Sequence, residues 1–193
     1  MKTSLLSVAS LSATLLLSQP TIAQQSTSNA MMKSMQSGMT QMMSMKLTGD
    51  PDRDFAMMLK MHHQSAVEMA DMEVKQGKNA QVKALASKIK ASNQKEIREL
   101  DQFMSSHKPQ SSSSKLGQKG MEIMHGGNHS MNGNVDHDFA SMMAQHHQQG
   151  VEMARAYLKE GKISTMKKMA NNVIKMQTKE MAELKKLESS LKS

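Results

Sequence analysis

Two adjacent histidines occur twice in the sequence, 84 residues apart; they are His62, His63, His146 and His147. Met58 lies one helical turn before the first pair, and Met142 and Met143 precede the second pair in the same way. Residues four apart on a helix project from the same face, so a thioether and an imidazole could close on one ion. Thioether sulfur is a soft ligand that favours Cu(I), whereas imidazole accepts Cu(I) and Cu(II) alike. The pattern predicts metal ligation, against the plainer interpretation that these are hydrogen-bonded core histidines.

The amino-acid composition excludes several other kinds of functional site. Of the 193 residues 24 are Met, and none is Cys or Trp. Without Cys the chain has no disulfide, no thiolate metal site and no iron–sulfur cluster. With one Tyr and three Phe, a base-stacking nucleic-acid platform is implausible. The formal net charge of +8 comes from Lys and Arg scattered along the chain, a pattern typical of solvated helix faces. We therefore expect no nucleic-acid partner.

The histidine pairs belong to an internal repeat. Residues 52–70 align with 136–154, and the agreement continues as far as Leu100 and Leu184. In each copy, apolar residues at helical spacing predict two helices, which gives hairpins at 50–107 and 135–193. The expected fold is all-α, an antiparallel four-helix bundle with a pseudo-twofold axis.

The ends of the first helix in each hairpin carry recognisable signals. Asp50 and Asn134 are expected to cap the helix starts, with Pro51 at the first helical position. Gly77 and Gly161 are expected to end these helices in the left-handed conformation.

A helical wheel places the histidines relative to the core. His62 and His146 fall in the middle of the apolar stripe of their helices, and His63 and His147 fall at its edge. The methionines that we expect to contribute to these sites are Met58, Met61, Met69, Met142, Met143 and Met153. Four methionines of the second helices are instead assigned to the core: Met166, Met169, Met176 and Met181.

The first 23 residues predict export. Lys2 precedes an apolar stretch at 5–17, and small residues lead up to Ala23. This is typical of a secretory signal peptide (1–23) cleaved near Ala23, and the apolar stretch is too short to span a bilayer. We expect a periplasmic or extracellular protein without stable membrane insertion, in an oxidising compartment where thioether is a safer sulfur ligand than thiol.

Two further segments, 24–49 and 108–134, are rich in Met but lack the large aliphatic residues needed for a core, and both are expected to be flexible. Their candidate soft-metal ligands are Met35, Met39, Met42, Met43, Met121, Met124, His125 and His129. The alternative for these segments is an amphipathic interaction helix.

The string Asp-x-x-Phe-x-x-x-(Leu/Met)-x-x-His-His-x-x-(Ala/Gly)-Val-x-Met-Ala occurs at 52–70 and at 136–154. It resembles the signature of a family of secreted helical proteins catalogued as a domain of unknown function, which includes CopM-type periplasmic copper-binding proteins. The resemblance covers about residues 50–193 and implies a ferritin-like four-helix bundle, binding of Cu(I), Cu(II) and Ag(I), and a role in copper resistance. One departure is Leu59, which stands where the family usually has Met, whereas Met143 keeps it. The first repeat is therefore expected to use Met58 or Met61, or to bind more weakly.

The function expected from these observations is sequestration or carriage of copper outside the cytoplasm, with a copper-transport or copper-sensing protein as partner, and no enzymatic activity. One alternative is a Met-rich helical module that grips a partner helix. A less favoured alternative is a di-iron or di-manganese oxidoreductase, which needs Glu-x-x-His on two helices. Only one such motif occurs, from Glu122 to His125.

Overall fold

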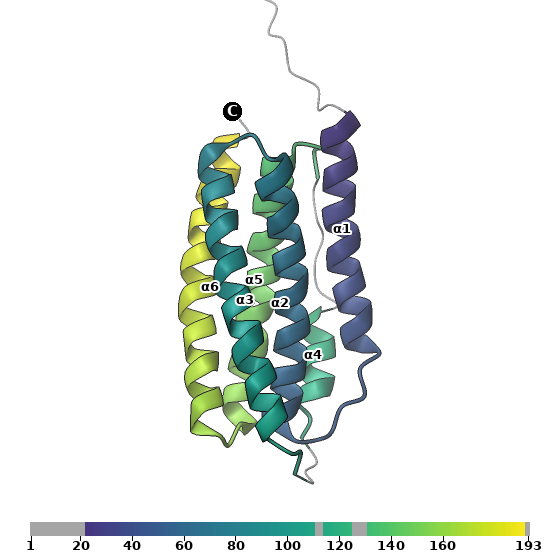
Figure 1. Cartoon of the computed structure of the whole chain (residues 1–193), viewed down its shortest axis with the longest axis vertical. Helices are drawn as coiled ribbons and strands as arrows, with labels where there is room; N and C mark the ends of the chain where they lie inside the picture. Colours follow the sequence, from purple (N-terminus) through teal and green to yellow (C-terminus); the bar gives the residue numbers. More distant parts are fainter. Residues whose placement is uncertain (1–21, 111–113, 125–130, 192–193) are drawn as a thin grey trace, which may run out of the picture.

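The computed structural model describes residues 22–110, 114–124 and 131–191, which form six α-helices and no strand (Figure 1). The helices are α1 (Ile22–Met43), α2 (Pro51–Gln76), α3 (Ala80–Ser106), α4 (Leu116–Met124), α5 (Val135–Glu160) and α6 (Ser164–Leu191). The all-α prediction is confirmed. The predicted signal peptide lies almost wholly outside the described residues, as do His125 and His129. Within the described ranges, no helix is long and apolar enough to cross a membrane.

Helices α2 and α3 pack against each other as one hairpin, and α5 and α6 pack against each other as another. Asp50 and Asn134 cap α2 and α5 through backbone N–H groups of the first turn, and Pro51 occupies the first helical position, as expected. The four long helices run side by side along the length of the molecule, and α2 packs against α5 (Figure 1). The described residues thus form six helices where the sequence predicted a bundle of four, and α1 and α4 are the unexpected ones.

The glycines that end α2 and α5 are needed for a different reason from the one expected. Gly77 and Gly161 have φ of −62° and −60°, so they are extended and not left-handed. A Cβ at Gly77 would lie 2.0 Å from Oε1 of Glu73, and one at Gly161 would lie 2.3 Å from the ring of Tyr157. Close approach of a large buried side chain therefore demands glycine here. The left-handed glycines are Gly49 (φ 80°) and Gly133 (φ 83°), in the turns that precede α2 and α5.

First-turn aspartates tie the two hairpins together reciprocally. The carboxylate of Asp52 on α2 accepts hydrogen bonds from the backbone N–H groups of Lys162 and Ile163 in the α5–α6 turn. Asp136 on α5 does the same for Lys78 and Asn79 in the α2–α3 turn. Each hairpin thus holds the turn of the other, which fixes the register in which α2 and α5 cross.

The segment predicted as a flexible arm is helix α1, which packs against α2 and α5. Met31 and Met42 of α1 are fully buried, and the hydroxyl of Ser34 donates to the carboxylate of Glu68 on α2. The prediction failed because it required Leu or Ile for packing, whereas flexible thioether side chains fill irregular gaps equally well. Within the predicted linker, the short helix α4 packs against α5 and α2.

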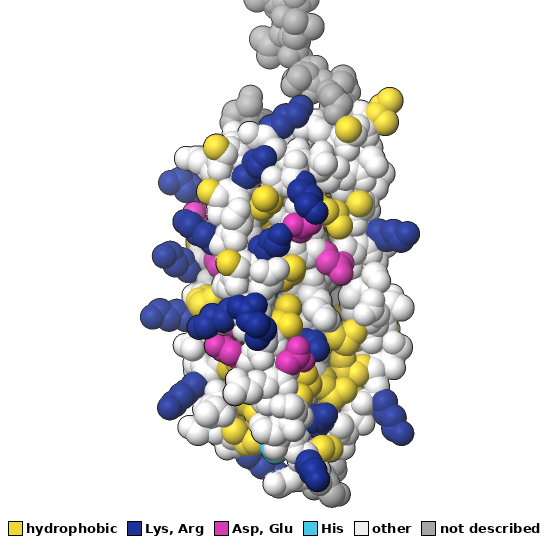
Figure 2. All heavy atoms as spheres, in the orientation of Figure 1, with side chains coloured by type: hydrophobic (Ala, Val, Ile, Leu, Met, Phe, Trp, Pro, Cys, Tyr) yellow, Lys and Arg dark blue, Asp and Glu magenta, His cyan; other side chains and the backbone are white. Residues whose placement is uncertain are grey.

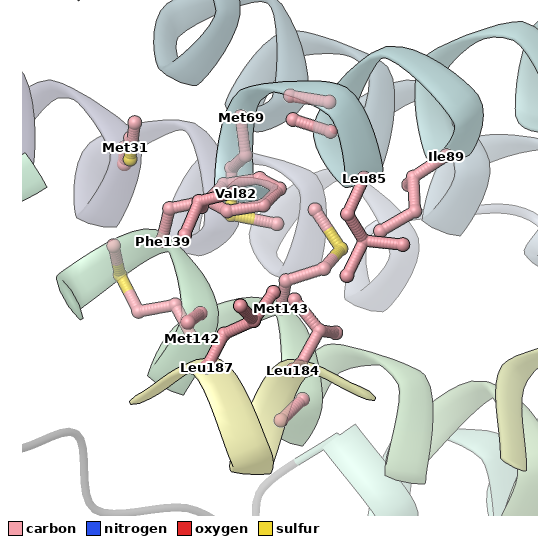
Figure 3. Close-up of a cluster of buried hydrophobic side chains, with 14 of the residues drawn as sticks. Met31, Met69, Val82, Leu85, Ile89, Phe139, Met142, Met143, Leu184 and Leu187 are labelled. Carbon is pink, nitrogen blue, oxygen red and sulfur yellow. The ribbon is translucent and has the colours of Figure 1, made fainter. Parts of the chain in front are cut away.

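The apolar core forms two clusters, one towards each end of the four long helices. The first is built around Phe139 and includes Leu85 and Leu184; Figure 3 shows it with Met69 and Met143 at its centre. The second is built around Phe55 and Tyr157, whose rings stack with centroids 4.1 Å apart.

The four methionines assigned to the core do not all lie in it. Met166 and Met181 are buried and Met169 is partly buried, but Met176 is 36% exposed. On the surface, Lys and Arg side chains are spread over the visible face and do not form a stripe, as the sequence indicated (Figure 2).

Candidate metal centre

The two histidines predicted at the centre of the apolar stripes meet each other. The rings of His62 on α2 and His146 on α5 stack with centroids 3.6 Å apart and an interplanar angle of 26°. Nε2 of His62 donates to the backbone carbonyl of His146 over 2.9 Å. Nε2 of His146 lies 3.1 Å from the hydroxyl oxygen of Ser65, which itself donates to the carbonyl of His62 and so accepts from the imidazole.

The two edge histidines pair with carboxylates on the second helix of their own hairpin. Nε2 of His63 lies 2.7 Å from Oε2 of Glu96 on α3, and Nε2 of His147 lies 2.8 Å from Oε2 of Glu180 on α6. Both imidazoles are completely buried, whereas the two carboxylates retain slight solvent contact. Glu96 and Glu180 correspond in the repeat, and that match was the only sequence signal for these partners.

These seven residues form what we call the histidine layer: His62, His63, Ser65, Glu96, His146, His147 and Glu180. Along α2 the layer falls between Leu59 and Ala66, and along α5 between Ala144 and Met153, so it separates the two apolar clusters. The predicted pairing of the two repeats thus produces one shared centre.

The two central imidazoles have the same tautomer. A carbonyl oxygen only accepts hydrogen bonds, so Nε2 of His62 carries the proton, and Ser65 imposes the same on His146. Nε2 of His63 and Nε2 of His147 face carboxylates at ion-pair distance but without hydrogen-bond geometry. The four Nδ1 atoms are buried and have no hydrogen-bond partner among the described residues. An imidazole whose N–H is fixed by an oxygen partner, leaving the other nitrogen free, is the arrangement in which histidine binds metals.

Electrostatics keeps the central imidazoles neutral. Burial, and then the neighbouring His63 and His147, hold the pKa of His62 well below its usual range. Burial holds the pKa of His146 low as well, with further contributions from the other three histidines. Metal ligation requires the neutral form of imidazole, so these rings need not release a proton before binding an ion.

The two halves of the layer are not identical. Gly150 on α5 allows a close approach: a Cβ there would lie 2.3 Å from Oε1 of Gln177 on α6 and 2.8 Å from Cε1 of His62. The corresponding residue of the first repeat is Ala66. Oε1 of Gln177 is buried and has no hydrogen-bond partner among the described residues, so a free oxygen lies close to the His62 ring.

The predicted thioether ligands lie on both sides of the layer. Met58 and Met153 belong to the cluster around Phe55, whereas the cluster around Phe139 contains Met69, Met142 and Met143. Met61 is only partly buried. No group of three or more His, Asp or Glu side chains among the described residues could hold a metal ion. A metal centre at this layer therefore needs sulfur ligands in addition to imidazole.

Helix α1 passes over the histidine layer. A Cβ at Gly38 would lie 3.0 Å from the hydroxyl oxygen of Ser65, so the two backbones are close at this point. Met35 packs against one apolar cluster and Met39 against the other, on either side of the layer. These two predicted ligands thus flank the point at which α1 approaches the layer.

The remaining predicted ligands are more dispersed. Met42 is buried in the cluster around Phe55, whereas Met43 is 39% exposed. On α4, Met124 is buried in the same cluster and Met121 is half-buried.

Residues 52–188 match the family described as "Domain of unknown function (DUF305)", and the chain belongs to this family. Its fold is similar to the crystal structure of a DUF305 fragment from Deinococcus radiodurans, with 18% sequence identity and a TM-score of 0.57. The similarity covers 72% of this chain and 96% of the fragment. No curated protein matches the sequence. Helix α1 lies outside the family match.

Proposed function

We propose that this protein binds copper at the histidine layer and acts outside the cytoplasm, as CopM-type proteins do, to sequester or carry Cu(I) and Cu(II), with Ag(I) as a further cargo. In this proposal α2, α3, α5 and α6 are the ferritin-like four-helix core that holds the site. The observation that carries the proposal is the set of four buried imidazoles whose Nε2 atoms each lie near an oxygen atom and whose Nδ1 atoms have no hydrogen-bond partner among the described residues.

The donor types favour copper over other metals. Structural zinc sites use thiolate, imidazole and carboxylate ligands, and the chain has no Cys. Imidazole with thioether is the combination that suits Cu(I), and imidazole alone retains affinity for Cu(II). Five methionines beside the layer are at most 1% exposed, which protects their sulfur from oxidation and makes it available only to an ion that enters the bundle.

The test is an anaerobic Cu(I) titration of the exported chain against a chromophoric chelator. Replacing the four histidines of the layer together with Ala is expected to lower the copper stoichiometry. The matched control is His107→Ala, because His107 pairs with Asp50 at the end of α3, outside the layer. Unchanged stoichiometry in a variant that keeps its helical circular dichroism would contradict the proposal.

A second set of variants separates the effect of removing the thioether sulfur from the effect of changing the packing of the core. Leucine conserves most of the volume of methionine, so Met→Leu at positions 58, 69, 142, 143 and 153 removes only the thioethers. We expect Cu(I) affinity to fall by at least about tenfold, or about 1.4 kcal/mol, with a smaller effect on Cu(II). Equal losses for both oxidation states would show that the thioethers are core residues and not ligands.

A further inference from the structure

A groove of about 480 Å³ lies between α3 and α6, the second helices of the two hairpins. Glu96, Glu99 and Phe103 line it from α3, and Met166 and Met169 line it from α6. It forms because α3 and α6 contact each other at few points, whereas each packs along its whole length against its own hairpin partner.

The groove leads to the histidine layer. Glu96, one of its lining residues, is the carboxylate that lies 2.7 Å from Nε2 of His63. The side chain of Glu96 is 12% exposed, and that of His63 is not exposed at all. Glu96 is therefore the residue that connects the solvent-accessible groove with the buried imidazole of His63. Glu180, its counterpart in the other repeat, does not line this groove.

The charge of the groove is opposite to that of the molecule. Its ionised lining residues are Glu96, Glu99 and Lys168, two negative charges against one positive. The chain as a whole carries a formal charge of +8, which repels cations from most of its surface. A negatively charged cleft with apolar walls concentrates cations locally and raises their association rate. The thioethers of Met166 and Met169 add soft donors along the same wall.

We propose that this groove is the route by which metal cations reach His63, and that Glu96 transfers them from solvent to the histidine layer. The inference rests on the proposed copper-binding function and adds to it the path and the transferring residue. A cation in the groove first meets the carboxylates. Once Glu96 pairs with the cation, Nε2 of His63 loses its carboxylate partner, and the ring is free to turn towards the ion.

The experiment compares Glu96→Gln with Glu180→Gln in the exported chain. Each variant loses one carboxylate charge but keeps an oxygen that can accept from histidine, so the two are matched in chemistry and differ in access to the groove. Cu(II) chloride is mixed with protein in a stopped-flow instrument and binding is followed by quenching of Tyr157, the only tyrosine. Copper bound at equilibrium is measured separately, by elemental analysis after gel filtration.

The Glu96→Gln variant is expected to load copper about tenfold more slowly than wild type, and clearly more slowly than the Glu180→Gln variant. Glu99→Lys, at the groove wall and away from the histidines, is expected to slow loading as well. The wild-type rate should fall as salt is added, because the local attraction is screened.

Equal loading rates in wild type, Glu96→Gln and Glu99→Lys, with normal stoichiometry, would overturn the route and leave the copper function intact. Equal slowing by Glu96→Gln and Glu180→Gln would also overturn it, because the carboxylates would then act through their histidines alone. A wild-type protein that retains no copper at equilibrium would overturn the proposed function itself, and the route with it.

Discussion

Glu73 and Tyr157 occupy corresponding positions in the two repeats and make the same contact with different chemistry. The hydroxyl of Tyr157 donates to Asp52 over 2.5 Å, while Asp52 also accepts from backbone N–H groups of the α5–α6 turn. Asp136 holds the other turn in the same way, and Glu73 lies beside it. Burial first, and then Asp136, raise the pKa of Glu73 to about 9.

This raised pKa predicts a loss of stability on the alkaline side. Between its ordinary value of 4.5 and about 9 the folded protein keeps a proton on Glu73 that the unfolded chain releases, so unfolding becomes easier as the pH rises. From about pH 7 to pH 9 we expect the melting temperature of the wild type to fall. Glu73→Gln, which donates without ionising, should flatten this dependence in thermal unfolding followed by circular dichroism.

The control for Glu73 is Glu183→Gln, which changes an exposed glutamate on α6 and should leave the wild-type slope unchanged. A more specific variant is Glu73→Tyr, which copies the second repeat and should also remove the slope. If Glu73→Gln and wild type lose stability in parallel over this range, the neutral carboxyl is not the cause.

At the residue scale, the sequence predicted the two histidine pairs and the central position of His62 and His146, because the helical period alone defines the stripe. It did not predict that Glu96 and Glu180 are the partners of His63 and His147. A contact between helices depends on how α3 and α6 rotate about their axes, and the period of each helix says nothing about that. The repeat match between the two glutamates was visible, but its meaning depends on the packing.

At the scale of helices, Gly150 sets how closely α5 and α6 approach. A Cβ there would meet Gln177 and His62 at 2.3 Å and 2.8 Å. We expect Gly150→Ala to cost roughly 1–3 kcal/mol from overpacking, reduced by up to about 1 kcal/mol from better helix propensity. The melting temperature should fall by a few degrees.

A double-mutant cycle tests whether the clash with Gln177 causes this loss of stability. In a Gln177→Ala background the main clash is gone, so Gly150→Ala should cost clearly less there than in wild type. Identical costs in both backgrounds would mean that Gln177 does not restrict the site. The neighbouring His62 would then be the residue that moves.

Helix boundaries were well predicted where capping residues mark them, as at Asp50, Pro51 and Asn134. Helix α1 was not, because its sequence has no acidic residue in the first turn and few aliphatic residues. Helix α1 is ordered because its methionines pack against a surface formed by α2 and α5. Such a surface exists only after the hairpins have paired, so local sequence patterns cannot reveal it.

At the scale of the whole molecule, α1 is a covering element added to the family domain. Met31 and Met42 are at most 2% exposed, and burial of one such side chain contributes about 1.5–3 kcal/mol. A chain that begins at residue 44 should lose about 3–6 kcal/mol of unfolding free energy, as an upper figure. Urea unfolding measures this loss, and an unchanged midpoint would contradict the packing of α1.

Copper experiments must take this packing into account. Removal of residues 24–49 removes candidate thioethers but also uncovers the core, so a loss of copper would have two causes. Met35→Leu with Met39→Leu keeps the packing and removes only the sulfur. A drop in Cu(I) stoichiometry at an unchanged melting temperature would then show that α1 contributes ligands to the histidine layer.

The stacked rings of His62 and His146 have an evolutionary consequence. A residue that touches its own repeat copy is the mark of a symmetric dimer whose two chains have become one. A single ancestral hairpin would have carried everything needed to meet a second copy of itself through this contact. After fusion the two halves could change independently. Two identical chains could not have differed at corresponding positions, whereas the fused halves differ between Glu73 and Tyr157, Leu59 and Met143, and Ala66 and Gly150.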